Sequence, residues 1–205
     1  MEEELARHGE LSEKYTGPAG GGSGPDSILL LPGEEEDREM YHFTKEFLHE
    51  KGYERYEISN YAKAGRECLH NLGYWTGADY LGLGLGAASL FEGERFSVTR
   101  SMERYLSLSG EDFREGRQYE DREVLTRQDR MEEFMFLGLR ITKGVKAEEF
   151  ENRFGQTIES VYGSVLGRLE EEGLLKMAGR GAERRYCLTE YGLDVSNHVL
   201  AEFLL

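Results

Sequence analysis

Five side chains that can bind a metal ion or stack on a flat ring lie within one eight-residue stretch. The stretch CLHNLGYW contains a thiol at Cys68, an imidazole at His70, an amide at Asn71, a phenol at Tyr74 and the only tryptophan at Trp75. Imidazole and thiolate are common ligands of transition metals, and the two aromatic side chains combine a flat apolar face with a polar tip. We expect this stretch to form a loop that serves as a ligand site.

A structural role competes with this interpretation. A single loop histidine beside aromatic residues is more often a satisfied structural residue than a metal ligand, and Cys68 is more often a small hydrophobe than a thiolate ligand. Cys187 lies in a predicted strand and is expected to be structural. His42 and His49 are seven residues apart on one predicted helix, too far for a helical pair.

Composition limits the classes of function. The chain has 205 residues, 39% of them hydrophobic, which is enough for a core. Its formal charge of -15 disfavours a nucleic-acid partner, because phosphate binding requires a basic face. The two cysteines form no C-x-x-C pair and predict a reducing, cytoplasmic location. We expect no transmembrane segment, because no apolar run reaches the roughly 18 residues that a membrane helix needs.

The first half of the chain has a flexible start followed by mixed helix and strand. Residues 1–27 include the glycine-rich run GPAGGGSGPD and are predicted to be a flexible segment. A helix is predicted over residues 34–51, with acidic residues in its first turn, a cap at Gly52 and an apolar stripe. The stripe consists of Met40, Phe43, Phe47 and Leu48. Tyr56, Ile58 and Tyr61 predict a strand and its exit.

The run YLGLGLGAASL predicts a second, buried strand over residues 80–90. Glycines at every second position, Gly82, Gly84 and Gly86, would leave one face bare for another backbone or a flat ligand. The spacing G-x-G-x-G is not the G-x-G-x-x-G of dinucleotide-binding folds. Glu57 and Asn60 are predicted at the end of the first strand, where barrel sites usually lie.

The second half predicts three helices and a hairpin, which is the outline of a winged helix. Helices are predicted from a capping box at Thr126–Asp129 to residue 139, over 146–154 and over 157–172, and a last helix follows Thr189. The third helix is acidic and would be repelled by phosphate. The hairpin is basic but carries only four positively charged side chains, which is little positive charge for the DNA-binding surface of a regulator. We expect a structural or docking domain.

Four segments carry a resemblance to a known family: GYERYEISNYAKAGRECLHNLGYW, YLGLGLGAAS, LTRQDRMEEFMFLGLRITKGV and LTEYGLDVSNHVLAEFL. Together they resemble the HemW family of heme chaperones, which are relatives of the oxygen-independent coproporphyrinogen III oxidases. The H-N-x-x-Y-W pattern from His70 to Trp75 favours the chaperone branch. The resemblance extends from about Leu31 to Leu205.

The resemblance implies an α/β (α+β) fold. Residues 28–122 would form the C-terminal strands and helices of a radical-SAM partial (β/α) barrel, and residues 123–205 a small winged-helix-like domain. Full-length members hold a 4Fe–4S cluster on a C-x-x-x-C-x-x-C motif and bind S-adenosylmethionine. That motif is absent here, so this chain is not expected to hold the cluster or cleave S-adenosylmethionine by itself, and its status as an enzyme stays open.

The resemblance also implies a function and a site. The chain would bind heme and deliver it to acceptor proteins such as respiratory cytochromes, with His70 as the iron ligand. Tyr74 and Trp75 would stack on the porphyrin, Asn71 would fix the loop and the His70 ring, and the three glycines of residues 82–86 would lie near the S-adenosylmethionine pocket. The alternative is an oxidase-like enzyme of porphyrin biosynthesis, inactive in this chain. A homodimer is left open.

Overall fold

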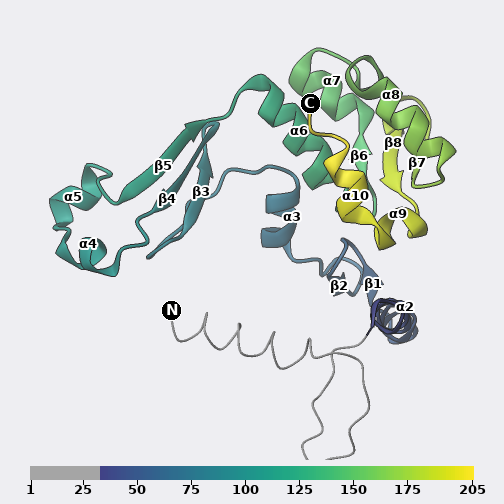
Figure 1. Ribbon diagram of the computed structural model, residues 1–205, viewed down its shortest axis with the longest axis horizontal. Helices are drawn as coiled ribbons and strands as arrows, with labels where there is room; N and C mark the ends of the chain where they lie inside the picture. Colours follow the sequence, from purple (N-terminus) through teal and green to yellow (C-terminus); the bar gives the residue numbers. More distant parts are fainter. Residues whose placement is uncertain (1–32) are drawn as a thin grey trace, which may run out of the picture. The chain divides into compact units, whose positions relative to one another are not determined.

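The computed structural model describes residues 33–205. The predicted flexible segment 1–27 and the ILLL run that follows lie outside the described residues. The chain divides into two compact units, with the boundary between Glu50 and Lys51. The mixed α/β fold class expected from the sequence is confirmed: Figure 1 shows helices and short strands alternating along the chain.

The first unit contains one described helix, α2 (Glu34–Glu50), close to the predicted range. Acidic residues fill its first turn, where the positive end of the helix dipole stabilises them. Gly52 follows with φ +78°, a conformation that glycine adopts without steric cost. Within the predicted apolar stripe Met40 and Phe43 remain 47% and 66% exposed, and the Phe43 and Phe47 rings stack with centroids 6.0 Å apart.

The predicted strand near Tyr56 is a small hairpin instead. β1 (Glu54–Arg55) pairs antiparallel with β2 (Tyr61–Ala62), and residues 56–60 form the turn between them. The amide of Tyr56 donates to the carbonyl of Asn60 across this turn. The Glu57 carboxylate accepts from the Ser59 backbone amide and from the Asn60 side chain. These local bonds replace the strand ladder, which explains why the alternating pattern did not extend.

The prediction of one buried strand over residues 80–90 is correct only at its end. Tyr80 makes one isolated antiparallel bridge to Leu90, residues 81–87 form a loop, and residues 88–90 belong to a strand, β3 (Ala88–Phe91), in which Leu90 is buried. Gly84 and Gly86 have φ of +97° and +70°, which reverses the chain where a strand would continue. The leucines between the glycines are consequently exposed, Leu83 by 92%.

An antiparallel sheet that the sequence patterns did not indicate follows this loop. Its order is β3 (Ala88–Phe91), β4 (Glu94–Val98) and β5 (Tyr119–Val124). The β4–β5 register shifts between Arg95 and Ser97. Two short helices, α4 (Met102–Ser107) and α5 (Gly110–Arg114), join β4 to β5. Charged residues interrupt the apolar alternation in β5, so the strand had no clear pattern.

The three predicted helices of the C-terminal region are confirmed as α6 (Arg127–Gly138), α7 (Ala147–Phe154) and α8 (Ile158–Glu171). The capping box before α6 is also confirmed. The amide of Thr126 donates to Asp129 Oδ2 at 2.7 Å, and the amide of Asp129 donates to Thr126 Oγ1 at 3.2 Å. The Thr126 hydroxyl and amide that bond to Asp129 lower the pKa of its carboxyl.

The predicted hairpin forms β7 (Leu175–Ala178) and β8 (Arg185–Leu188), joined through the 3₁₀ turn η1 (Gly181–Glu183). A third strand that the sequence did not indicate, β6 (Val145–Lys146), pairs with β8, so the order is β6-β8-β7. The last predicted helix is broken into α9 (Glu190–Asp194) and α10 (Ser196–Ala201), because Val195 leaves helical geometry at φ -112° and ψ 29°.

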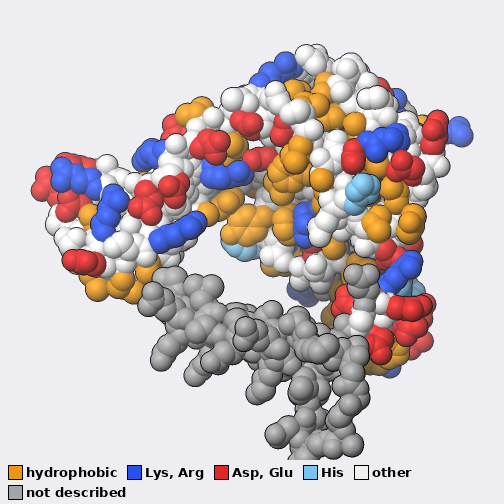
Figure 2. Space-filling model, in the orientation of Figure 1, with side chains coloured by type: hydrophobic (Ala, Val, Ile, Leu, Met, Phe, Trp, Pro, Cys, Tyr) orange, Lys and Arg blue, Asp and Glu red, His pale blue; other side chains and the backbone are white. Residues whose placement is uncertain are grey.

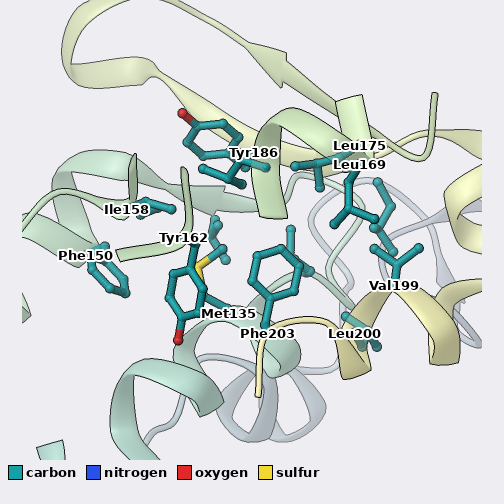
Figure 3. Close-up of a cluster of buried hydrophobic side chains, with 14 of the residues drawn as sticks. Met135, Phe150, Ile158, Tyr162, Leu169, Leu175, Tyr186, Val199, Leu200 and Phe203 are labelled. Carbon is teal, nitrogen blue, oxygen red and sulfur yellow. The ribbon is translucent and has the colours of Figure 1, made fainter. Parts of the chain in front are cut away.

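A single buried cluster joins these C-terminal elements (Figure 3). Aromatic rings pack edge to face across it: Phe150 against Tyr162 at 6.2 Å, and Tyr162 against Phe203 at 5.4 Å. Such pairs add to the stabilisation that burial alone supplies. Buried residues from Met131 to Phe203 therefore share one core, which includes Leu139 at the end of α6. None of the helices in residues 33–205 is both long and apolar enough to cross a membrane.

Two glycine-to-alanine substitutions should have opposite effects on stability. A Cβ at Gly192 would lie 2.0 Å from the Leu174 carbonyl oxygen, whereas a Cβ at Gly163 in α8 meets nothing within 4 Å. We expect Gly192→Ala to lower the free energy of unfolding by about 1–3 kcal/mol through overpacking. Gly163→Ala should raise it by about 0.5–1 kcal/mol. Urea unfolding followed by circular dichroism measures both, and a neutral Gly192→Ala would contradict the packing of α9 on residue 174.

Removal of the Tyr162 hydroxyl should change how stability depends on pH. This hydroxyl is buried and has no hydrogen-bond partner among the described residues. Burial, and then the charge of Glu132, raise the pKa of Tyr162 from 10.0 to about 12. Between these values the folded chain keeps the proton and the unfolded chain loses it, so stability falls as pH rises. Tyr162→Phe should therefore gain stability relative to wild type from pH 10 to 12, as measured by urea unfolding. If the free energies of unfolding of the two proteins change with pH in parallel, Tyr162 does not have a raised pKa.

Candidate functional site

The residues singled out by their chemistry lie on a short helix, not on the loop that the sequence predicted. This helix, α3, spans Leu69–Trp75. It begins where the Cys68 carbonyl accepts the Leu72 amide at 3.0 Å. It ends at Thr76, whose hydroxyl donates to the Leu72 carbonyl, and at Gly77 with φ +66°. The glycine in this left-handed conformation is a standard helix stop.

Little within α3 itself stabilises it. It has seven residues, contains Gly73 and buries no residue fully, and its N-cap Cys68 makes no side-chain cap bond. Isolated helices shorter than about 12 residues are marginal in water. Contacts with other elements must therefore hold α3 in place.

His70 and Tyr74 share one face of α3, as residues four apart on a helix do. The His70 side chain is exposed, and its ring meets the Tyr74 ring edge to face at 4.7 Å. Tyr74 in turn meets the ring of Tyr80 at 4.6 Å. Asn71 makes no side-chain hydrogen bond within residues 33–205. The hydrogen bond by which Asn71 was expected to fix the His70 ring is therefore not seen among these residues, and the ring that contacts His70 is that of Tyr74.

Exposed apolar side chains lie close in the chain to the residues of this face. Leu69 is 81% exposed, and Tyr80 leads directly into the loop where Leu81 and Leu83 are 54% and 92% exposed. Figure 2 shows hydrophobic side chains gathered beside a histidine over the region where Figure 1 draws α3. Exposed apolar groups that cluster around a polar ligand group are typical of binding surfaces.

Trp75 makes different contacts from Tyr74. The Arg140 guanidinium lies over its ring, 4.4 Å from the centroid, and the indole nitrogen is buried without a hydrogen-bond partner in the described part of the chain. Consecutive helical residues point about 100° apart. Tyr74 and Trp75 therefore do not form one continuous stacking surface, although both were expected to face the same ligand.

Trp75 also lines a pocket of about 360 Å³. Its walls carry carboxylates, Asp79, Glu92 and Glu149 among them, and the guanidinium groups of Arg130 and Arg153. The volume falls within the range of about 300–1,000 Å³ for small-ligand sites. Neither His70 nor Tyr74 lines it, so the pocket and the exposed His70 face are separate features, and the mixed charge of the walls selects no class of ligand.

The three glycines of residues 82–86 are explained by backbone geometry. A Cβ at Gly82 would lie 2.2 Å from the Ala88 carbonyl oxygen, so the close neighbour is another backbone. The Gly82 amide also donates to the buried Ser89 hydroxyl at 3.0 Å. Gly84 and Gly86 supply the positive φ of the loop. Their expected place near a ligand pocket stays a prediction.

Glu57 and Asn60 lie together in the turn after β1. The Glu57 carboxylate is fully buried, and its Oε1 accepts from the Ser59 amide at 2.9 Å and from Asn60 Nδ2 at 2.6 Å. Its Oε2 has no partner among residues 33–205. The backbone of Glu57 bridges to Ile141, directly after α6, so this turn is tied to the C-terminal domain.

The other candidate ligands are dispersed. Among the described residues no three His, Cys, Asp or Glu side chains gather in a way that could hold a metal ion. Cys68 is exposed, whereas Cys187 is buried and its thiol donates to the Lys143 carbonyl at 3.1 Å. Burial raises the pKa of Cys187, which suits the expected structural role. The two thiols do not fit the four-thiolate donor set of an iron–sulfur cluster.

One of the cations of the β7–β8 hairpin is neutralised inside the C-terminal domain. Arg184 pairs with Glu159 of α8 at 2.8 Å. Tyr186 donates a hydrogen bond to the same Glu159 carboxylate at 2.6 Å. The Arg184–Glu159 pair reduces the positive charge that the hairpin presents to a phosphate backbone.

The sequence did not indicate that Arg140 belongs to the site. It lies 65 positions after Trp75, in no motif of its own, and nothing in residue spacing connects the two side chains. Residues 140–142 pair with residues 56–58 of the β1–β2 turn. From this position the Arg140 side chain reaches Trp75 of α3.

Comparison with known proteins gives concordant matches. The model of the HemN C-terminal domain matches residues 125–195. The heme chaperone HemW of Bacillus subtilis is 37% identical over 176 residues, which cover 86% of this chain and 45% of the relative. HemW of Lactococcus lactis is 34% identical over 87% of this chain and 45% of the relative. The chain thus spans about half the length of these curated relatives.

A solved structure has the same fold. The coproporphyrinogen III oxidase HemN of Escherichia coli, described as a radical SAM enzyme, aligns with a TM-score of 0.66 over 85% of this chain and 42% of that chain. At 16% sequence identity the match concerns the fold alone.

Glu57 should contribute to stability through the two donors that it accepts. In Glu57→Ala the Ser59 amide and the Asn60 side chain lose a buried acceptor, which should lower the free energy of unfolding by about 1–3 kcal/mol. Glu57→Gln keeps an acceptor oxygen and is the matched control, with a smaller loss. Urea unfolding of both variants tests this, and equal losses in the two would show that the hydrogen bonds are not the cause.

Proposed function

Because the chain belongs to the family of HemW heme chaperones and HemN-type oxidases, whose C-terminal part it matches, we propose that it binds heme at His70 and passes it to acceptor proteins. The observation that carries this proposal is an exposed imidazole on the same face of α3 as Tyr74, beside exposed leucines. A neutral imidazole is a good axial ligand of heme iron.

The surroundings of His70 suit a flat apolar cargo. The exposed leucines at positions 69, 81 and 83 would cover the apolar rim of a porphyrin, and burial of their surface contributes roughly 25 cal/mol per Å². Tyr74 contacts the edge of the imidazole and restricts how the ring can turn. Its phenol provides a polar tip within the same apolar face.

Exposure of the site favours transfer over storage. A ligand group that is open to solvent can pass its cargo to a partner without unfolding, whereas a buried site would require opening first. Heme-acceptor proteins, with respiratory cytochromes as the example, are the proposed partners. We place this activity in the cytoplasm, where two thiols that form no disulfide remain reduced.

The oxidase-like function is the second candidate, and the fold shared with HemN favours it. The family name implies a 4Fe–4S cluster and S-adenosylmethionine in the full-length proteins. The two cysteines of this chain do not fit the ligand set of a 4Fe–4S cluster, so its own residues do not support radical chemistry on S-adenosylmethionine. Reconstitution with iron and sulfide tests this candidate: a stable brown cluster on this chain would favour it.

Replacement of His70 should weaken heme binding. We expect His70→Ala to raise the dissociation constant for hemin at least about tenfold, or ~1.4 kcal/mol, and to shift the Soret band, because the proposed axial ligand is removed. Titration of the full chain with hemin, followed by absorbance, measures both.

The matched control is His198→Ala, which removes another exposed histidine, in α10. This variant should titrate like wild type. If His70→Ala binds hemin with unchanged affinity and an unchanged Soret band, His70 is not the ligand and the proposal fails.

A further inference from the structure

The helix that carries His70 contacts the C-terminal domain at its other end. α3 is short, its N-cap Cys68 makes no side-chain cap bond, and it buries no residue fully. Its first turn, which carries His70, is exposed. Its last turn, at Trp75 and Thr76, meets α6 and α7 of the C-terminal domain. A short helix held at one end transmits any change there to the other.

Arg140 is held firmly where it meets Trp75. Its amide donates to the Leu137 carbonyl at 3.1 Å, and its carbonyl accepts the Ile58 amide at 3.1 Å. Directly before it, Leu139 is fully buried in the C-terminal core. The guanidinium 4.4 Å from the Trp75 centroid is well within the roughly 6 Å limit of a cation–π contact.

A second arginine from the same domain reaches the same end of α3. Arg153 Nη1 donates to the Thr76 carbonyl at 3.4 Å, and its guanidinium lies 5.5 Å from the Phe134 ring of α6. A cation at the last carbonyls of a helix is favourable, because this end carries the negative pole of the helix dipole. Arg153 therefore supports the attachment, and Arg140 provides the closest charged contact with an α3 side chain.

We propose that Arg140 is a positioning residue for heme binding: by clamping Trp75 it fixes α3 and directs the His70 imidazole toward its cargo. The C-terminal domain then acts as the platform of the binding helix. This inference rests on the proposed function, since it concerns the same His70 site. Arg140 does not itself contact the iron.

The test is a hemin titration of the full chain carrying Arg140→Gln. Glutamine keeps a polar side chain but removes the cation. From the usual range of cation–π contacts we expect the dissociation constant for hemin to rise about 3- to 30-fold. At saturation the Soret band should keep its wild-type position, because His70 still ligates the iron. A purely structural loss would lower the amount of folded protein and leave the affinity of the remainder unchanged.

Trp75 provides an independent readout, because it is the only tryptophan of the chain. In the apo protein Arg140→Gln should shift its emission to longer wavelength and increase quenching by acrylamide. Arg140→Lys, which keeps the charge, should restore part of both the emission and the affinity, but not all, because a lysine lacks the planar group that stacks on a ring.

The matched control is Arg122→Gln, which removes another arginine over an aromatic ring, 5.3 Å from the Phe96 centroid in the β3-β4-β5 sheet. Arg122→Gln should change neither the emission of Trp75 nor the affinity for hemin.

Wild-type hemin affinity in Arg140→Gln, with shifted emission, would overturn the positioning role while the His70 proposal stands. Weaker hemin binding with unchanged emission would also overturn it, because Arg140 would then act by another route. Unchanged binding in His70→Ala would instead remove the proposed function itself. If Arg140→Gln fails to fold, Arg140→Lys and Arg153→Gln decide the matter by the same two readouts.

Discussion

The shortness of α3 is the constraint on which the candidate site depends. A seven-residue helix with an internal glycine and no side-chain bond at its N-cap does not stay formed on its own. The core of the C-terminal domain, which runs from Met131 to Phe203 and includes the end of α6, therefore supplies the rigidity that α3 lacks. Arg140 is the point of connection: its backbone is bonded to the β1–β2 turn, and its guanidinium covers Trp75. The geometry of the binding proposed at His70 would thus depend on the C-terminal domain as much as on the helix that carries this residue.

The molecule separates a packed region from an exposed one. The C-terminal core buries interlocking aromatic rings, which favours a single rigid arrangement. The region from Leu69 to Leu85 instead exposes an imidazole and several leucines. Rigid support beneath an accessible apolar face suits reversible binding of a flat ligand, because little has to be ordered when the ligand arrives.

The relation to longer relatives defines what this chain contributes. It spans 45% of the HemW proteins that it matches and shares the fold of 42% of the HemN chain. Its two cysteines lie on separate elements, one exposed and one buried, and do not provide a cluster site. The chemistry that its own residues support is therefore ligation and apolar contact at α3, with the winged-helix-like domain as its support.

The sequence by itself determined the helices of the C-terminal domain, because capping residues and 3.6-residue periodicity act locally: the Thr126–Asp129 box and the stop at Gly155 are both present in the structure. It also identified His70, Tyr74 and Trp75 as chemically unusual residues. Only the tertiary structure showed that they lie on a helix, that Tyr74 and Trp75 meet different partners, and that residues 81–87 form a loop before strand β3. These features arise from pairings between residues far apart in the chain, such as Ile58 with Arg140, and local propensity carries no information about them.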